Sequence, residues 1–231
     1  MVNSIFITGT DTGVGKTVVT AFLGGYLSGK GVKVVTQKWI QTGCAGISGD
    51  VAFHTKFIGS GEKHLEKYQT ERTPYVLEFP SSPHLAALLE KKHIDAEKIE
   101  RAFLKLSKEF DLVLVEGTGG FMVPINDEQT IGDIVKGLCL PVLVVAENRL
   151  GAINQTLLTV EALRKRGLEI LGIVFNRLSK EGDRLILEDN LRIVKRLTGV
   201  EVLGELPFSE DMDALYRSFL PVGEKIFNRL N

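Results

Sequence analysis

The residues best suited to chemistry lie near the N-terminus, in the stretch Gly9-Thr10-Asp11-Thr12-Gly13-Val14-Gly15-Lys16-Thr17. Glycines let a backbone curl so that successive N–H groups point inward at an anion. Lys16 can reach terminal phosphates as a point charge, and the Thr17 hydroxyl can ligate Mg²⁺. An apolar strand-like run precedes the stretch and a helix-like run follows it. The pattern therefore predicts a phosphate-binding loop that faces a helix N-terminus.

The loop departs in one place from the spacing G-x-x-x-x-G-K-[ST]. Its first glycine is Gly9, one residue earlier than that spacing requires, and Thr10 stands in the glycine's place. A glycine-rich structural turn with a structural lysine is the alternative, and the flanking strand and helix patterns disfavour it. A dinucleotide fingerprint is excluded, because Val18 stands where its third glycine should be.

Lys38 comes near the end of a second strand-like run, Val32–Ile40, and the loop after it begins at Gln41. In open parallel sheets, ligands bind outside the carboxyl ends of the strands. Lys38 is therefore a candidate for the same site as the phosphate loop. A solvated surface lysine is the alternative, and without the phosphate loop it would be preferred.

Two carboxylates are candidate Mg²⁺ ligands. Glu116 ends the unbroken apolar run Asp111–Val115, which predicts a strand buried on both faces. Burying a charged carboxylate at that position costs free energy unless a cation pairs with it, so we expect Glu116 to meet Mg²⁺. The alternative is a carboxylate at the rim of the sheet that is hydrated by water. Asp50 is the first residue of a short predicted helix, Asp50–Ile58. Its simpler role is to cap the N-terminus of that helix, and the alternative is to ligate Mg²⁺.

Composition argues for small-molecule chemistry. The 231 residues carry 28 Lys and Arg and 29 Asp and Glu, a net charge of −1. Nothing in this balance suggests a nucleic-acid surface or a polybasic membrane anchor. The two cysteines lie far apart and the four histidines show no ligand spacing, which argues against a disulfide framework and a zinc site. Since no signal-peptide pattern or membrane-span pattern is present, we expect a cytoplasmic protein.

Strand and helix patterns alternate along the chain. We expect an α/β fold in a single domain over residues 1–231, with a mostly parallel sheet and helices on both faces. The segment 44–83 is irregular, with the helix at 50–58 and an extended piece near 75–78. One further helix is predicted to follow the phosphate loop, and the others span residues 84–91, 95–110, 130–138, 152–166 and 183–198. The other predicted strands are 4–8, 141–147, 170–176 and 201–206.

The end of the strand at 170–176 bears on the choice of base. A guanine-specific phosphate-loop protein would be expected to show Asn-Lys-x-Asp there, and the chain has Asn176-Arg177-Leu178-Ser179. This favours adenine.

The combined motifs resemble dethiobiotin synthetase, an ATP-dependent family of the P-loop NTPase type. Five blocks carry the resemblance over most of the chain: Gly9–Thr17, Lys38 with Thr42-Gly43, Val115–Gly120, Leu150–Asn154, and more loosely Pro80–His84. Two positions differ from the family pattern. Trp39 stands where a proline usually follows the lysine, and Thr42 stands where serine is common.

The resemblance implies a reaction in biotin biosynthesis. One amine of 7,8-diaminopelargonic acid takes up CO₂ as a carbamate, ATP phosphorylates the carbamate, and the second amine closes the ureido ring with release of phosphate. It implies that Lys16, Lys38 and Thr12 are catalytic. It implies that Thr17, Asp50 and Glu116 hold Mg²⁺. It also implies a homodimer with its active sites at the subunit interface.

The resemblance also implies the binding residues. Substrate contacts are expected at Thr12, Lys38, Thr42, Gly151 and Asn154. Nucleotide contacts are expected at Gly13, Val14, Gly15, Lys16, Thr17, Val18, Asp50, Glu116, Gly117, Thr118 and Gly119, and around adenine at Asn176, Arg177, Glu205, Leu206 and Pro207.

Two other classes share this type of loop. A partition-type ATPase switch carries a second lysine in the loop, where this chain has Asp11, and often a basic surface. A cobyrinate-type amide ligase usually carries a glutaminase domain, for which we expect no room in 231 residues. Both alternatives are therefore less favoured than the ligase.

Overall fold

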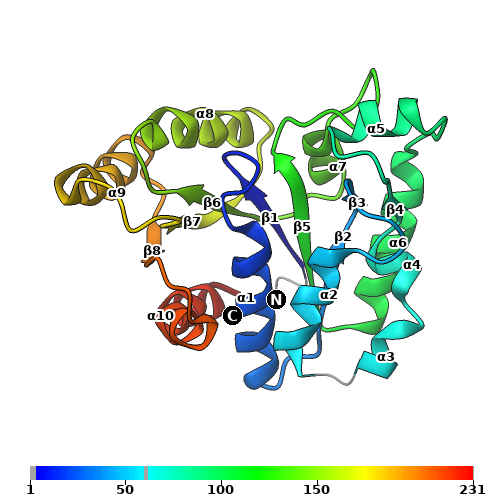
Figure 1. Cartoon of the computed structure of the whole chain (residues 1–231), viewed down its shortest axis with the longest axis horizontal. Coiled ribbons are helices and arrows are strands. Elements are labelled where there is room, and N and C mark those ends of the chain that lie inside the picture. The colour runs from blue at the N-terminus through cyan, green and yellow to red at the C-terminus, as the bar shows by residue number, and fades with distance from the viewer. Residues whose placement is uncertain (1–3, 60–61, 231) are drawn as a thin grey trace.

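The computed structural model describes residues 4–59 and 62–230 and has a six-stranded central sheet (Figure 1). Its strand order is β2-β5-β1-β6-β7-β8, and every pairing is parallel. The strands are β1 (Ser4–Gly9), β2 (Val34–Lys38), β5 (Leu112–Gly120), β6 (Val142–Glu147), β7 (Ile170–Asn176) and β8 (Val202–Leu206). This confirms the predicted fold class.

Helices cover both faces of the sheet, as Figure 1 shows. On one face α1 (Lys16–Gly29) and α10 (Met212–Leu230) pack on the sheet through Phe22 and Phe219. The opposite face is covered by α6 (Ala96–Glu109), α7 (Ile131–Gly137), α8 (Ala152–Lys165) and α9 (Arg184–Thr198). The helical spacing of Ile99, Phe103 and Leu106 on α6 puts all three into that core, as predicted.

The predicted strand at 32–40 is divided in the structure. β2 ends at Lys38, and β3 (Ile40–Gln41) pairs with β4 (Tyr75–Val76) in a separate two-stranded sheet. Between them Trp39 is buried, and its ring lies 5.2 Å from the ring of Phe6. The chain therefore leaves the main sheet immediately after Lys38, where a large apolar side chain anchors it to the core.

The irregular segment contains more helix than predicted. α2 (Gly49–Ile58) matches the prediction, but α3 (Glu62–Glu66) and α4 (Gln69–Arg72) were missed, and α5 (Pro83–Leu89) follows them. The predicted N-cap at Asp50 is wrong. Ser48 caps α2 by accepting the Val51 N–H at 3.2 Å, and Asp50 lies in the first turn.

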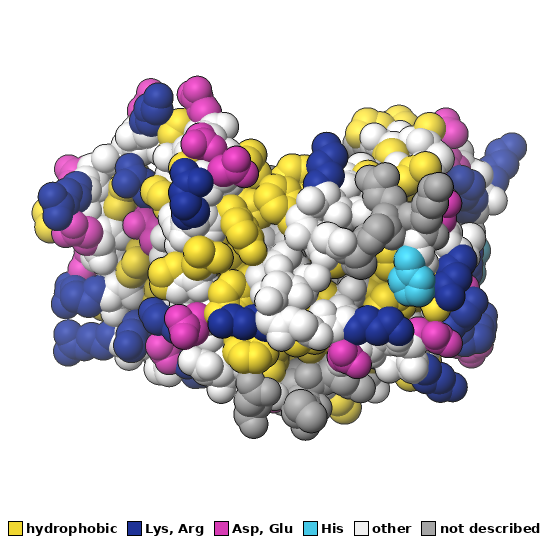
Figure 2. All heavy atoms as spheres, turned by 90° about the horizontal axis from the view of Figure 1, so that it is seen from below, with side chains coloured by type: hydrophobic (Ala, Val, Ile, Leu, Met, Phe, Trp, Pro, Cys, Tyr) yellow, Lys and Arg dark blue, Asp and Glu magenta, His cyan; other side chains and the backbone are white. Residues whose placement is uncertain are grey.

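The surface of the described residues carries mixed charge. Figure 2 shows basic and acidic side chains interspersed over the face seen from below. Over residues 4–59 and 62–230, no helix is long and apolar enough to cross a membrane.

Candidate active site

The phosphate loop connects β1 to α1, and two of its glycines have left-handed backbone angles. Gly13 has φ +77° and Gly15 has φ +97°. A Cβ atom at Gly15 would lie only 2.0 Å from the Asn176 Nδ2. Glycine is therefore required at position 15 both for its backbone conformation and for the close approach of the end of β7.

The early glycine has a steric reason in this structure. A Cβ atom at Gly9 would lie 2.7 Å from the Asp11 carbonyl oxygen and 2.8 Å from the Lys16 Nζ. The loop folds back over Gly9 in this way because Lys16 donates a hydrogen bond to the Asp11 carbonyl at 2.9 Å. The position of Gly9 is therefore part of how this loop closes on its lysine.

A pocket of about 310 Å³ opens where the loop meets the carboxyl ends of β2 and β5 and the start of α2. It is lined by Thr12, Gly13, Gly15, Lys16, Thr17, Lys38, Gln41, Thr42, Asp50, Glu116, Thr118 and Gly119. All but Gln41 were candidates from the sequence. The sheet topology therefore brings residues more than 100 positions apart into one cavity.

Lys38 lies at the centre of this pocket and is 4% exposed. Its Nζ donates to the Glu116 Oε1 at 2.7 Å and to the Gly117 carbonyl at 3.1 Å, and forms an ion pair with the Asp50 Oδ2 at 2.8 Å. Although burial opposes its charge, the attraction of Glu116 and Asp50 raises the pKa of Lys38 above its ordinary value. The alternative of a solvated surface lysine is wrong.

Glu116 is also buried, at 1% exposure, so the alternative of a rim carboxylate in water is wrong. Thr17 donates to its Oε1 at 3.0 Å, and the Nε2 of His54 lies 2.8 Å from its Oε2. Burial opposes the charge of Glu116, but Lys38 and His54 outweigh it and lower the carboxyl pKa to about 2. Glu116 is therefore ionised at neutral pH.

His54 is the main residue of this cluster that the sequence reasoning missed. It is fully buried on α2, four residues after Asp50, and its Nδ1 has no hydrogen-bond partner among the residues that the structure describes. The i, i+4 spacing from Asp50 places both side chains on one face of the helix, which was the available signal. Without a metal-ligand spacing, the sequence alone predicts a satisfied or exposed histidine at position 54.

Lys16 supplies the second cation of the pocket. It is 5% exposed, and burial together with repulsion from Lys38 lowers its pKa from 10.5 to about 8. Two ammonium groups thus share the cavity with two carboxylates, Asp50 and Glu116, but both carboxylates pair with Lys38, whereas the Lys16 Nζ donates to the Asp11 carbonyl. An anion with several negative oxygens would relieve this repulsion, as a nucleotide phosphate does.

The oxygen donors of the pocket fit a hard cation such as Mg²⁺. Thr17 and Glu116 are hydrogen-bonded to each other, and Asp50 is joined to Glu116 through the Lys38 ammonium. The described residues hold no group of three His, Cys, Asp or Glu side chains arranged for a metal. A cation here would therefore depend on the Thr17 hydroxyl, the two carboxylates and oxygens of a ligand or water.

The residues expected around adenine lie beside the loop, at the ends of β7 and β8. Asn176 donates to the Val14 carbonyl at 3.1 Å, which joins β7 to the phosphate loop. The Nε of Arg177 is buried and finds no hydrogen-bond partner in the described part of the chain, and Pro207 is exposed. Leu206 is fully buried in the core, so only its backbone can face a ligand.

A missed asparagine organises this region. Asn148, at the end of β6, donates to the Glu205 Oε1 at 2.7 Å and accepts from the Asn190 Nδ2 at 2.8 Å. Glu205 is thus held by Asn148, which Asn190 of α9 holds in turn. Of the other expected contacts, Val14 is buried within the loop and Val18, in the first turn of α1, is partly buried against the core. Gly117 lies against the Phe6 ring, where a Cβ would approach to 2.9 Å.

Gly151 and Asn154 lie at the start of α8 and do not line the pocket. Both are exposed. The nearest link to the loop is a hydrogen bond of 3.4 Å from Gln155 to the Asp11 carboxylate. Within one chain, these two residues are therefore separate from Lys16 and Lys38.

Comparison with known proteins identifies the family. The chain is 42% identical over 179 residues to the ATP-dependent dethiobiotin synthetase BioD of Chlorobaculum tepidum, covering 78% of this chain and 74% of that protein. The chain belongs to the dethiobiotin synthetase family. Another dethiobiotin synthetase, BioD 2 of Haemophilus influenzae, is 44% identical over 172 residues, covering 74% of this chain and 90% of that one. A family model described as an AAA domain matches residues 3–215.

Solved structures show that the dethiobiotin synthetase fold seen here is shared more widely. The septum site-determining protein MinD of Pyrococcus horikoshii, complexed with Mg-ADP, superposes with a TM-score of 0.63 at 17% identity. The match covers 100% of this chain and 98% of that one. At this identity the likeness establishes the fold alone.

Proposed function

We propose that this chain is an ATP-dependent ligase that makes dethiobiotin from 7,8-diaminopelargonic acid and CO₂ in biotin biosynthesis. The observation that carries the proposal is the pocket in which Lys16, Lys38 and Glu116 meet, in a chain of the dethiobiotin synthetase family. A phosphate-binding lysine, a second buried lysine and ionised carboxylates are the groups that phosphoryl transfer to an anionic acceptor requires.

The phosphate loop binds ATP in this proposal. The N–H groups of Gly13, Gly15 and Thr17 face the phosphates at the N-terminus of α1, and Lys16 neutralises charge on the γ-phosphoryl group. Adenine lies beside Asn176, Arg177 and the turn from Glu205 to Pro207. These residues stand at the ends of β7 and β8, next to the loop.

Lys38 and Thr12 act on the acceptor. One amine of the diamine adds CO₂ and loses a proton to give a carbamate, whose oxygen attacks the γ-phosphorus while ADP leaves. Lys38, held by two carboxylates, stabilises the negative charge of the carbamate and of the transferring phosphoryl group. Thr12 lines the same pocket, and Thr42 lies at its edge to contact the diamine.

The second amine then closes the ring. It attacks the carbonyl of the carbamic-phosphoric anhydride, phosphate departs with the electron pair of the broken C–O bond, and the cyclic urea loses the amine proton. The groups that lower the barrier to phosphoryl transfer also stabilise the departing phosphate. Binding both amines beside Lys38 supplies the proximity that ring closure requires.

Mg²⁺ is part of the proposal, with Thr17, Asp50 and Glu116 as its protein ligands. When bound, it would neutralise charge on the phosphate oxygens and orient them. His54 holds the Glu116 carboxylate from the side opposite Lys38 and so fixes its orientation.

The deciding experiment is turnover with the purified protein. ATP, Mg²⁺, bicarbonate and 7,8-diaminopelargonate should give dethiobiotin, ADP and phosphate in equal amounts, detected by mass spectrometry and a phosphate assay. ATP hydrolysis should depend on both the diamine and bicarbonate. Hydrolysis without dethiobiotin formation would refute the assignment and favour a nucleotide switch.

A first prediction concerns the metal. Glu116→Gln keeps the shape of the side chain but removes a charged ligand, so the Mg²⁺ concentration for half-maximal turnover should rise at least about tenfold. Glu147→Gln, at the end of β6, which β1 separates from β5, is the matched control and should leave the Mg²⁺ titration unchanged. An unchanged titration for Glu116→Gln would remove Glu116 from the metal site.

A further inference from the structure

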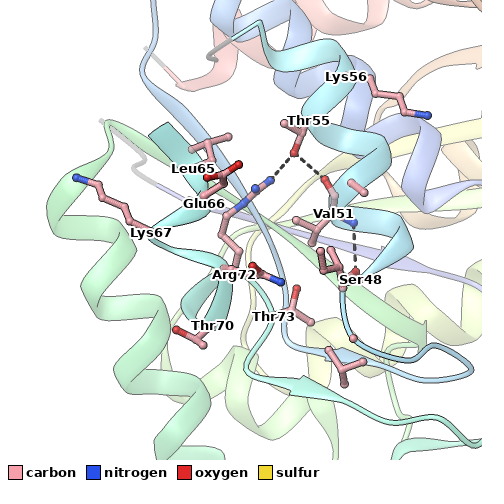
Figure 3. Close-up of a pocket in the computed structure, with 15 residues that line it drawn as sticks. Ser48, Val51, Thr55, Lys56, Leu65, Glu66, Lys67, Thr70, Arg72 and Thr73 are labelled. Carbon is pink, nitrogen blue, oxygen red and sulfur yellow. Dashed lines mark hydrogen bonds between the residues drawn. The ribbon is translucent and has the colours of Figure 1, made fainter. Parts of the chain in front are cut away.

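A second and larger cavity, of about 580 Å³, lies on the other side of α2 (Figure 3). We call it the Arg72 pocket. Its walls come from α2, from the residues just before it, and from α3, α4 and β4. None of the residues that line it lines the pocket of the phosphate loop. It is therefore a separate site.

Arg72 is the buried cation of this cavity, with 6% exposure. Its Nε donates to the Thr36 carbonyl at 3.2 Å, and its Nη2 donates to the hydroxyls of Thr36 at 3.3 Å and Thr55 at 2.8 Å. Figure 3 shows the guanidinium extending toward Thr55. In residues 4–59 and 62–230, no hydrogen bond is found for Nη1 and no carboxylate forms an ion pair with Arg72.

A buried guanidinium without a counterion is costly, because burial disfavours its charge. That burial lowers the pKa of Arg72 to about 10. The group is therefore still charged at neutral pH, and three neutral oxygens do not compensate it. A charge held in this way favours an anion in the adjoining cavity.

The rest of the lining narrows the class of anion. Of the described residues that line the Arg72 pocket, Lys56, Lys67 and Arg72 are basic and Glu66 is acidic, which gives this lining a net charge of +2. Apolar side chains form much of the wall, among them Ile47, Val51, Ala52, Leu65 and Val76. A bare inorganic ion would leave that apolar surface against water, whereas an aliphatic chain would cover it.

We propose that the Arg72 pocket binds a small aliphatic carboxylate, whose carboxylate pairs with Arg72 and whose chain lies on the apolar wall. Because Nε and Nη2 are already hydrogen-bonded to Thr36 and Thr55, Nη1 is the nitrogen that can donate a charge-assisted hydrogen bond to such a group. The site goes beyond the proposed ligase reaction, and binding to it is measured without turnover.

The structure also provides a reporter for this site. Gln37 donates to the carbonyl of Glu71, the residue before Arg72, at 2.8 Å. The Trp39 Nε1 donates to the Gln37 side chain at 2.9 Å, and Trp39 is the only tryptophan of the chain. A ligand that pairs with the Arg72 guanidinium should therefore change the fluorescence emission of Trp39.

The test uses sodium hexanoate as the probe, titrated into the full chain and followed by calorimetry and Trp39 emission. One hexanoate should bind per chain, at least about tenfold more tightly than 1-hexanol or inorganic phosphate. Equal affinity for hexanol would refute the ion pair with Arg72. Equal affinity for phosphate would refute the role of the apolar wall.

Two variants place the binding at this cavity. Arg72→Met removes the cation, and Ala52→Phe fills the cavity from the exposed side of α2 while leaving Arg72 in place. Each should weaken hexanoate binding at least about tenfold. Arg196→Met, an exposed arginine on α9, is the matched control and should bind as the parent chain does. Unchanged binding in Ala52→Phe overturns the proposal even if Arg72→Met fails to fold.

Discussion

At the scale of single residues, Lys38 shows how burial and partners decide what a side chain does. Its ammonium group is held by Glu116, Asp50 and the Gly117 carbonyl, so its position is set before any ligand binds. Such preorganisation is what makes a charge effective at a transition state, because no solvent needs to reorganise around it. The same lysine at an exposed strand end would be flexible and hydrated.

Replacing Lys38 tests this role. We expect Lys38→Met to lower kcat by about a hundredfold, the usual scale for the loss of one preorganised charge. ATP affinity should stay near that of the parent chain, because Lys16 and the loop remain. Lys195→Met, an exposed lysine on α9, serves as the control. Parental turnover in Lys38→Met would exclude Lys38 from the chemistry.

Lys16 predicts a pH dependence of nucleotide binding. Its pKa in the free protein is lowered to about 8, by burial first and then by Lys38. Phosphate favours the charged form and so raises this pKa in the complex, which means that binding takes up a proton above pH 8. Affinity for ADP should therefore be constant below pH 8 and fall as the pH rises above it, by up to about tenfold per unit.

Calorimetry in the presence of EDTA, at pH 7 to 9.5 and in two buffers of different ionisation enthalpy, measures both the affinity and the proton uptake. Lys16→Arg is the control, because its guanidinium remains protonated over this range. Its residual affinity should be independent of pH. A flat profile for the parent chain would contradict the lowered pKa of Lys16.

At the scale of elements, α2 contributes residues to two pockets. In the pocket of the phosphate loop, Asp50 pairs with Lys38 and His54 contacts the Glu116 carboxylate. On the other side, the Thr55 hydroxyl accepts a hydrogen bond from Arg72 of the second pocket. The helix is fixed at its start by Ser48, which accepts the Val51 N–H and donates to the Gln41 side chain at 2.8 Å. One cap therefore sets the position of residues that serve both cavities.

Removing this cap should cost stability. Ser48→Ala leaves the Val51 N–H and the Gln41 oxygen without their partner, and we expect the free energy of unfolding to fall by about 1 kcal/mol. Urea denaturation followed by circular dichroism measures it. Ser107→Ala, which removes a hydroxyl on α6 that donates to the Leu104 carbonyl of the same helix, should change it much less. Equal effects would show that the Ser48 contacts contribute nothing beyond a surface hydroxyl.

At the scale of the whole molecule, the expected substrate contacts do not all belong to one pocket. Gly151 and Asn154 lie outside the cavity that contains Lys38. They are flanked by exposed apolar side chains, Leu150 at 77% and Leu158 at 57% exposure. We propose that a homodimer buries this surface, which would bring the start of α8 to the partner's substrate.

Sedimentation equilibrium tests the dimer. The parent chain should sediment as a dimer, and Leu158→Glu should shift it toward the monomer because it buries a charge at the interface. Leu197→Glu on α9 is the matched control, since Leu197 is exposed to a similar extent, 60%. A monomeric parent chain would refute the interface, and so would equal effects of the two substitutions.

The elements that could be predicted from the sequence are those with strong local signals. β1, the phosphate loop, β5 and the amphipathic α6 all follow from the order of apolar, glycine and charged residues. α3, α4 and the break after Lys38 do not, because these short elements are stabilised by contacts distant in the sequence. The break depends on the packing of Trp39 against Phe6 and on the pairing of β3 with β4.

For the site, the sequence by itself determined the residue types: a glycine-rich loop with Lys16 and Thr17, a lysine at one strand end and a carboxylate at another. Only the tertiary structure decided their partners. The parallel register sets Lys38 beside Glu116, and α2 adds His54 to the same carboxylate. Strand order, register and burial are long-range properties, so a lysine and a glutamate 78 positions apart become a buried ion pair only when the sheet forms.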